Sequence, residues 1–181
     1  MTTDTPAAAP AAPGSFFSRA LDKKAAGLAF VLGLAAILGA LGSQYFGGLQ
    51  PCELCLEQRL AYYWGLPVLA GVLVLWNRIP VAVWFIAVGV VAAIFAWGAY
   101  MGVYHAGVEY GFWPGPTACT GTGTGISFED LNNLTPVVPC DKVQFQLWGV
   151  SLAGMNALVS LAIVGLLLIA IGDQWRRVRK S

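Results

Sequence analysis

The sequence predicts an all-α membrane protein built as an up-down-up-down bundle of four transmembrane helices. Of its 181 residues 57% are apolar and only 10% are charged, whereas a soluble domain carries about 25% charged residues. The charges leave four uncharged intervals, at residues 25–52, 60–77, 79–108 and 143–172. Each can hold one membrane-spanning helix, which takes roughly 20 apolar residues. This composition excludes a disordered chain, a soluble nucleic-acid binder and most water-soluble enzymes.

The positive charges predict how the bundle is oriented in the membrane. Eight of the ten Lys and Arg residues lie before the first interval, between the second and third, or after the fourth, and two lie on the other side: Arg59 and Lys142. Lys and Arg concentrate in cytoplasmic segments near span ends. We therefore expect the termini and the short middle loop in the cytoplasm and the two outer loops on the opposite side of the membrane. The net charge of +1 provides no field that would recruit nucleic acid.

The chain is expected to begin with a disordered cytoplasmic tail at residues 1–20, because this stretch is rich in Ala, Pro and Thr and poor in side chains that pack. A single membrane domain is expected at residues 21–175. Its first span, at about residues 26–46, is longer than the apolar region of a signal peptide, which has about 7–15 residues. We therefore expect an uncleaved span, which Gly47 and Gly48 end.

The other three spans are expected at about residues 57–76, 80–104 and 147–171, and a basic cytoplasmic tail at residues 176–181 follows them. Pro51 suits the first turn of the helix that leads into the second span. Short connections make successive spans antiparallel neighbours. The simplest architecture is therefore a four-helix bundle with one long outer loop between the third and fourth helices.

The two outer loops, at residues 47–56 and 105–146, differ in kind. The second contains a run of Thr and Gly at residues 120–125 and several prolines, so its backbone is expected to be mobile. Within it, Ser127 can cap a short helix on the membrane surface, with Asp130 three residues later.

All four cysteines lie in or beside the outer loops: Cys52, Cys55, Cys119 and Cys140. Disulfides persist in an oxidising compartment, so two cysteine pairs that face it are expected to be disulfides. A c-type haem is excluded because Leu56, and not a histidine, follows the second cysteine. Structural zinc is disfavoured because 20 residues separate Cys119 from Cys140, where a metal knuckle has about two to four. We assign no metal.

The spacing of Cys52 and Cys55 favours a redox-active pair over a structural one. A bridge across two intervening residues closes almost no loop, whereas a bridge between Cys119 and Cys140 would restrain the unfolded chain by about 3 kcal/mol. On the first turn of a helix, unpaired N–H groups and the positive end of the helix dipole stabilise a thiolate. A thiol with a lowered pKa is a good leaving group and is reactive at ambient pH.

Two further residues are candidates for the same site. Arg59 lies one helical turn after Cys55 on the same face. At that depth a charge usually has a partner, either the Cys55 thiolate or an oxygen of a bound electron acceptor. The alternative is a snorkelling arginine that pairs with Glu57. His105, the only histidine, ends the third span and can exchange protons near neutral pH, or can be a simple interfacial residue.

These features together resemble the DsbB family of disulfide bond formation proteins. The resemblance rests on the segment Gln50–Arg59 (QPCELCLEQR), on His105, on the cysteine pair of the second outer loop and on the segments PCD at 139–141 and WGVSL at 148–152. It covers about residues 25–171. It implies a four-helix membrane enzyme that reoxidises DsbA, a periplasmic thioredoxin-like oxidase, and passes electrons to membrane quinone (ubiquinone or menaquinone).

The resemblance also implies an order of events among the cysteines. Cys119 and Cys140 would form the disulfide that meets the partner, and Cys119 would take the attack of the partner's thiolate. Cys140 would then attack Cys52 and release Cys55 as a thiolate beside the quinone ring.

Two more roles follow from the same resemblance. Arg59 would hold a quinone oxygen or the Cys55 thiolate. His105 would assist the quinone ring or its protons.

Two other functions remain as alternatives. A vitamin K epoxide reductase-like protein also combines four spans, two cysteine pairs and a quinone. Its partner-facing pair precedes the Cys-x-x-Cys pair, however, and the order here is reversed. A disulfide-stapled membrane scaffold with no turnover is the second alternative, and its bridges would resist mild reductant and would not respond to quinone.

Overall fold

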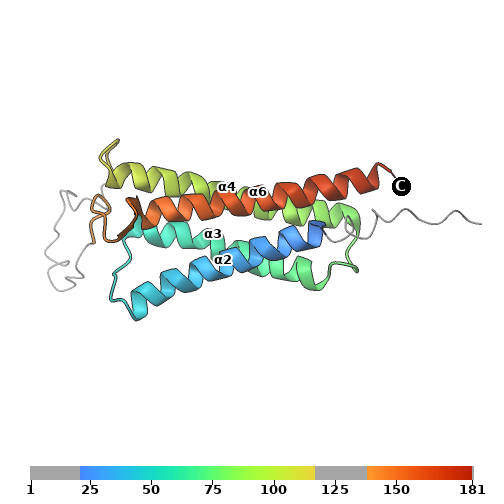
Figure 1. Ribbon diagram of the computed structural model, residues 1–181, viewed down its shortest axis with the longest axis horizontal. Coiled ribbons are helices and arrows are strands. Elements are labelled where there is room, and N and C mark those ends of the chain that lie inside the picture. Colours follow the sequence, from blue (N-terminus) through green and yellow to red (C-terminus); the bar gives the residue numbers. More distant parts are fainter. Residues whose placement is uncertain (1–20, 117–137, 181) are drawn as a thin grey trace, which may run out of the picture.

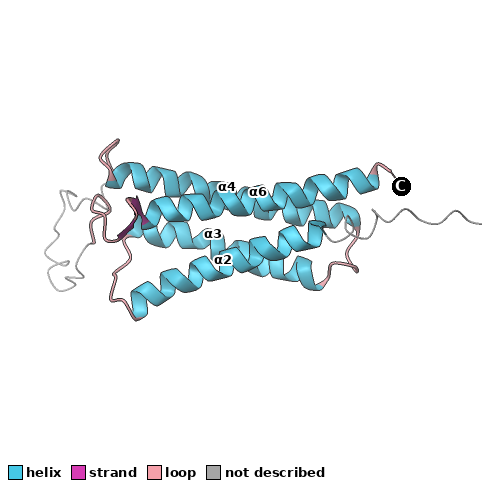
Figure 2. Cartoon of the chain, viewed as in Figure 1, coloured by secondary structure: helices cyan, strands magenta, loops and turns pink. Residues whose placement is uncertain are grey.

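The computed structural model describes residues 21–116 and 138–180, which form four long helices that lie side by side (Figure 1). The helices are α2 (Leu21–Tyr45), α3 (Glu53–Val74), α4 (Val81–Glu109) and α6 (Leu152–Val178). The rest of the described chain is loop, apart from one pair of short strands (Figure 2). The mostly helical fold predicted from the sequence is confirmed. The tail expected at residues 1–20 and the short helix expected at Ser127 lie outside the described residues.

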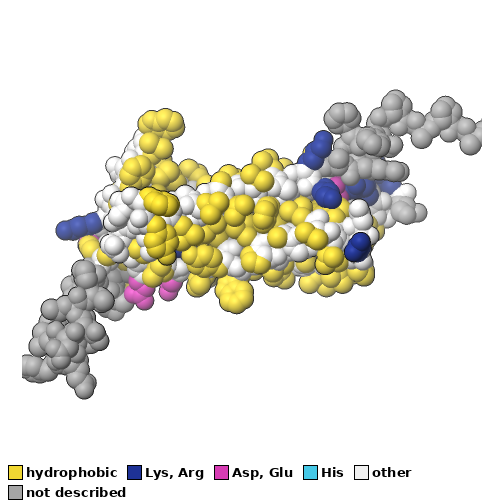
Figure 3. Space-filling model, turned by 90° about the horizontal axis from the view of Figure 1, so that it is seen from below, with side chains coloured by type: hydrophobic (Ala, Val, Ile, Leu, Met, Phe, Trp, Pro, Cys, Tyr) yellow, Lys and Arg dark blue, Asp and Glu magenta, His cyan; other side chains and the backbone are white. Residues whose placement is uncertain are grey.

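Three of the four helices are long and apolar enough to cross a membrane: α2, α4 and α6. The fourth, α3, has 22 residues but carries four polar side chains in its first two turns, which lower its mean hydropathy: Glu53, Glu57, Gln58 and Arg59. Large apolar side chains of the bundle point outward, among them Leu28, Val31, Ile86, Trp97, Leu161 and Leu168. Hydrophobic side chains cover the middle of the face in Figure 3, and Lys and Arg lie toward its two ends. Such an apolar surface indicates contact with lipid.

Two helix boundaries differ from those expected. The helix α4 continues to Glu109, so that His105 lies inside it and not at its end. The helix α6 begins only at Leu152, because the residues before it form a hairpin of β1 (Gln146–Leu147) and β2 (Val150–Ser151). The two residues of its turn have positive φ angles, 51° at Trp148 and 82° at Gly149, as the common two-residue hairpin turn requires.

Small residues let α4 and α6 approach each other closely in the core. A Cβ atom at Gly102 would lie 2.8 Å from the backbone nitrogen of Ala157 on α6. Elsewhere in the bundle the largest fully buried apolar side chains come from three helices: Leu69 of α3, Val88, Val91 and Phe95 of α4, and Ile163 and Leu167 of α6. The bundle is therefore held by close backbone contact and by interlocking aliphatic side chains, as in other helical membrane proteins.

We expect Gly102→Ala to lower the free energy of unfolding by about 1–3 kcal/mol, because the added methyl group meets backbone that cannot turn away. Gly89 on the same helix is the matched control, since nothing lies within 4 Å of a Cβ built there. Gly89→Ala should be neutral or slightly stabilising. Denaturant unfolding of the detergent-solubilised variants measures the difference, and equal stabilities would contradict the close approach of α4 to α6.

One end of the bundle, where α2 begins and α6 ends, is held by buried charges (Figure 1). Asp22 is only 1% exposed and forms an ion pair with Arg177, which also lies 3.3 Å from Asp173. Beside them four aromatic rings make edge-on contacts in a row: Trp76, Trp84, Phe85 and Trp175. This network ties the first helix to the last at the end opposite the cysteines.

Candidate functional site

The start of α3 places two cysteines at the opposite end of the bundle. Cys52 is the N-cap residue of α3, in an extended conformation (φ −78°, ψ 172°), and its sulfur accepts a hydrogen bond from the backbone nitrogen of Cys55 at 3.3 Å. Cys52 is only 3% exposed, and Cys55 is partly buried. Both are free thiols. The helix start predicted after Pro51 thus brings both sulfurs to one side of the first turn.

The two thiols differ in acidity. The pKa of Cys55 is lowered, chiefly because the side chain of Cys52 hydrogen-bonds to its sulfur. The positive charge of Arg59 lowers the pKa further, whereas burial and the negative charge of Glu109 act in the opposite direction. The pKa of Cys52 is raised by the same hydrogen bond and by its own burial. Cys55 is therefore the more acidic thiol of the pair.

We expect an alkylating reagent at neutral pH to modify Cys55 of the reduced protein at least about tenfold faster than Cys52, because only the thiolate reacts and each unit of pKa changes its population about tenfold. Since the pKa of Cys55 is lowered, its labelling rate should fall only at pH values below the usual range for a thiol. Peptide mass spectrometry measures both rates. Equal rates in the folded protein would contradict the assignment, and unfolded protein is the control.

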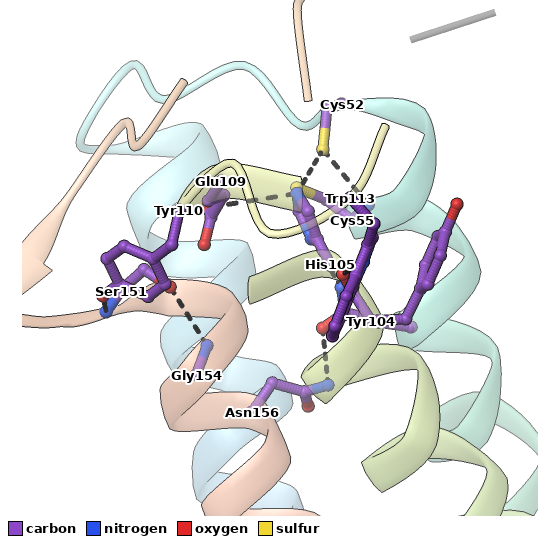
Figure 4. Close-up of polar contacts among 11 residues, drawn as sticks. Cys52, Cys55, Tyr104, His105, Glu109, Tyr110, Trp113, Ser151, Gly154 and Asn156 are labelled. Carbon is purple, nitrogen blue, oxygen red and sulfur yellow. Dashed lines mark hydrogen bonds and ion pairs between the residues drawn. The ribbon is translucent and has the colours of Figure 1, made fainter. Parts of the chain in front are cut away.

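The imidazole of His105 lies beside both sulfurs (Figure 4). Its Nε2 atom is 3.6 Å from the Cys52 sulfur and 3.9 Å from a carboxylate oxygen of Glu109. The reactive atoms of Cys52, Cys55 and His105 all lie within 4.8 Å of one another. The sequence predicted that this histidine reaches the head of the second span, and the structure brings it there. The three donor atoms are also close enough to share a soft metal ion.

A chain of polar side chains continues from His105 into the bundle. Gln58 lies 2.6 Å from the Nδ1 atom of His105, Asn156 donates to Gln58 at 2.6 Å, and Tyr62 donates to Asn156 at 2.5 Å. The Tyr62 hydroxyl also lies 3.4 Å from Ser160. Sequence reasoning gave no role in the site to Gln58, Asn156 or Tyr62. The available signal was the pair of polar residues Asn156 and Ser160, four apart in an otherwise apolar span.

Arg59 lies one turn beyond Cys55 and faces α2. Its guanidinium donates to the side-chain oxygen of Gln44 at 2.5 Å and to the carbonyl oxygen of Ala40 at 3.4 Å. These contacts tie the arginine to the neighbouring helix, where sequence reasoning offered Glu57 as the alternative partner. The guanidinium is thereby held at a fixed place close to the cysteine pair.

A cavity of about 440 Å³ lies next to the pair, between α2, α3 and α6. Its polar lining includes Cys55, Arg59 and His105, and apolar residues line its walls, among them Ala36, Ile37 and Val159. Cavities of about 300–1,000 Å³ with apolar walls and a few polar groups are typical of small-molecule sites. This cavity can therefore hold a flat, mostly apolar molecule with its polar atoms near Arg59 and its edge near Cys55.

The second cysteine pair is described in part. Cys140 is 1% exposed and packs in one buried cluster with Cys52, its sulfur is disulfide-bonded, and its main chain hydrogen-bonds to the ring of His105. Cys119 lies outside the described residues. Cys140 lies 88 residues after Cys52 and 85 residues after Cys55 in the sequence. The structure brings it into one buried cluster with the pair on α3.

Comparison with known proteins gives one match. A model of the family described as disulfide bond formation protein DsbB matches residues 22–170, which include α2, α3, α4 and most of α6. No curated protein and no solved structure matches the chain.

Proposed function

The chain belongs to the DsbB family of disulfide bond formation proteins, and from this membership we propose that it reoxidises a periplasmic DsbA-like thioredoxin-fold oxidase and passes the electrons to the membrane quinone pool. Membership of the family implies a thiol oxidoreductase of the membrane. The finer proposal rests on one observation: a cavity with apolar walls borders Cys55, the cysteine whose pKa is lowered.

We propose that all four helices cross a bacterial inner membrane, up-down-up-down, with both termini in the cytoplasm and the cysteines at the periplasmic face. Three helices are long and apolar enough to do so, and α3 is packed among them, with Leu66, Leu69 and Val72 buried. The excess of Lys and Arg at the opposite end supports this orientation.

The cavity suits a quinone. One end offers a cation, Arg59, to a ring oxygen, His105 lines the same end, and the apolar walls suit an isoprenoid tail. A bound quinone supplies the oxidant, because it accepts two electrons and two protons. At the boundary between membrane and water, a quinone can keep its tail in lipid while the cysteine pair remains within reach of a water-soluble protein.

The residues of the chain are proposed to act in a fixed order. The partner's thiolate attacks Cys119 in the Cys119–Cys140 disulfide, and Cys140 leaves as a thiolate. Cys140 then attacks Cys52 of an oxidised Cys52–Cys55 pair, and Cys55 leaves as the thiolate beside the cavity. The place of Cys140 and Cys52 in one buried cluster supports this transfer. The partner's second cysteine then resolves the mixed disulfide and releases the Cys119 thiolate, which attacks Cys140 in the Cys52–Cys140 bridge, restores the loop disulfide and frees Cys52 as a thiolate. Cys52 and Cys55 form their bridge again as their two electrons pass to the quinone.

The test is turnover by the full chain in lipid nanodiscs, with a reduced thioredoxin-fold oxidase and with ubiquinone or menaquinone. We expect one quinone reduced for each partner disulfide formed, measured by quinone absorbance and by thiol titration. A scaffold protein would leave both signals unchanged, and that result would overturn the proposal.

We expect Arg59→Ala to raise the KM for quinone about tenfold or more, because the variant loses a charge-assisted hydrogen bond to a quinone oxygen. The KM for the protein partner should change little. Arg78→Ala is the matched control, since Arg78 is exposed at the other end of α3. Steady-state kinetics with each substrate varied in turn measures the difference. An equal effect on both KM values would make Arg59 a merely structural residue.

A further inference from the structure

We propose that Gln58 and Asn156 are positioning residues that fix which nitrogen of His105 carries the proton, so that the Nε2–H of the neutral ring faces the sulfur of Cys52. The inference rests on the proposed function, because it assigns these residues a part in the chemistry of Cys52. Its first test reads the protonation of the ring directly and needs no turnover.

The Nδ1 side of the ring meets a donor. The amide nitrogen of Gln58 lies 2.6 Å from Nδ1, and the amide oxygen of the same side chain accepts a hydrogen bond from Asn156. Because an amide has one oxygen and one NH₂ group, an oxygen engaged by Asn156 leaves Gln58 to present its NH₂ group to His105. A nitrogen that faces a donor must be the unprotonated one.

The orientation of Asn156 is fixed in turn by Tyr62. The Tyr62 hydroxyl donates to the amide oxygen of Asn156 at 2.5 Å, which leaves the NH₂ group of Asn156 for Gln58. The direction of donation therefore runs unbroken from Tyr62 through two amides to Nδ1. Gln58 is 5% exposed and His105 is 2% exposed, so a reversed amide would not be compensated by bulk water.

The Nε2 side of the ring meets acceptors. The Cys52 sulfur lies 3.6 Å away and a carboxylate oxygen of Glu109 lies 3.9 Å away. A carboxylate and a thiolate sulfur accept hydrogen bonds and cannot donate them, so both require a donor. Both sides of the ring thus select the same arrangement, with the proton on Nε2.

This arrangement determines what His105 can do for Cys52. A neutral ring with its proton on Nε2 donates a hydrogen bond to the sulfur and stabilises the Cys52 thiolate. It cannot remove a proton from Cys52 with that nitrogen, because its lone pair is on Nδ1. The burial that raises the pKa of Cys52 makes this donor important whenever Cys52 must act as a nucleophile to restore the Cys52–Cys55 bridge.

The protein allows a direct test of this arrangement, because His105 is the only histidine in its sequence. Full-length protein in nanodiscs, with ¹⁵N-labelled histidine, gives NMR signals from one imidazole, and protonated and unprotonated ring nitrogens have well-separated shifts. We expect a protonated Nε2 and an unprotonated Nδ1 in the wild type. A wild-type ring with its proton mainly on Nδ1 would overturn the proposal.

Two substitutions by residues of similar size should reverse the direction of hydrogen-bond donation between residue 156, residue 58 and His105. Gln58→Glu presents a carboxylate to Nδ1 and should move the proton there. Asn156→Asp does not touch His105, but its carboxylate can only accept, so the Gln58 amide must turn its NH₂ group toward residue 156 and its oxygen toward Nδ1. We expect the proton on Nδ1 in both variants. The wild-type pattern in both would show that these residues do not position the ring.

Ser160→Ala is the matched control, because Ser160 lies beyond Tyr62, at the end of the hydrogen-bonded series that is farthest from His105. This variant should keep the proton of His105 on Nε2. In turnover, we expect Asn156→Asp to lower kcat about tenfold, the effect of one lost hydrogen bond to a charged sulfur. An unchanged kcat would overturn the assigned role. If the wild type showed no quinone-dependent turnover, the proposed function would fail, while the NMR result would still decide the positioning of His105.

Discussion

Replacement of Cys55 by serine is expected to abolish quinone-dependent oxidation of a thioredoxin-like dithiol, with a loss of at least about a thousandfold in kcat. Cys55 is the more acidic thiol of the pair and borders the cavity, so we propose that electrons leave the chain through this sulfur. A serine hydroxyl fills nearly the same space but forms no disulfide. Reduction of added quinone, followed by absorbance, measures the loss.

The matched variant is Cys52→Ser, which retains Cys55 and its neighbour Arg59. It should also stop turnover, but visible charge-transfer absorption with added quinone should persist in it and should be missing in Cys55→Ser. Unchanged turnover of Cys55→Ser would remove the role assigned to this sulfur. Absorption that persists without Cys55 would show that another group contacts the quinone.

Replacement of Cys119 by serine should stop oxidation of the protein partner while the Cys52–Cys55 pair remains reoxidisable by quinone. The reason is the proposed order of exchange, in which the partner reaches the pair only through the loop disulfide that includes Cys140. Two measurements separate the halves of the path: the partner's thiols are titrated after mixing, and quinone reduction is recorded after the pair has been reduced chemically.

Rapid partner oxidation by Cys119→Ser would contradict this order, since it would mean that the partner attacks the pair on α3 directly. Failure of the pair to react with quinone in this variant would instead indicate that the loop cysteine is needed to form the site. Ser127→Ala, in the same loop, is the control and should preserve both halves of the reaction.

The helices could be predicted from the sequence because charged residues bound long apolar segments, and each of these segments is long enough for one helix. Each uncharged interval overlaps one helix, although α6 begins nine residues after the start of its interval, and α3 begins shortly after Pro51. The hairpin before α6 could not be predicted in this way, because it depends on a tryptophan with a positive φ angle at Trp148, where glycine or asparagine is the usual signal. The hydroxyl of Tyr110, the C-cap residue of α4, donates to the carbonyl oxygen of Gly149 and accepts a hydrogen bond from the backbone nitrogen of Ser151, and these contacts stabilise the turn.

The site was predictable where its residues are close in sequence and not where they meet through packing. Cys52, Cys55 and Arg59 share the start of one helix, so their spacing alone places them together. The partners Gln58 and Asn156 are 98 residues apart and belong to different helices. A single polar residue in an apolar span shows that a partner exists, but which residue it meets depends on how the helices rotate against one another.

The ion pair at the other end of the molecule affects how membrane orientation should be tested. Charge-reversal experiments usually alter basic residues of a tail, on the assumption that these act only as topological signals. Arg177 is different, because its loss would strand the buried carboxylate of Asp22 at a cost of about 3–5 kcal/mol. Reporter fusions intended to report sidedness should therefore change Arg176 or Arg179 instead, so that an inverted chain is not mistaken for an unfolded one.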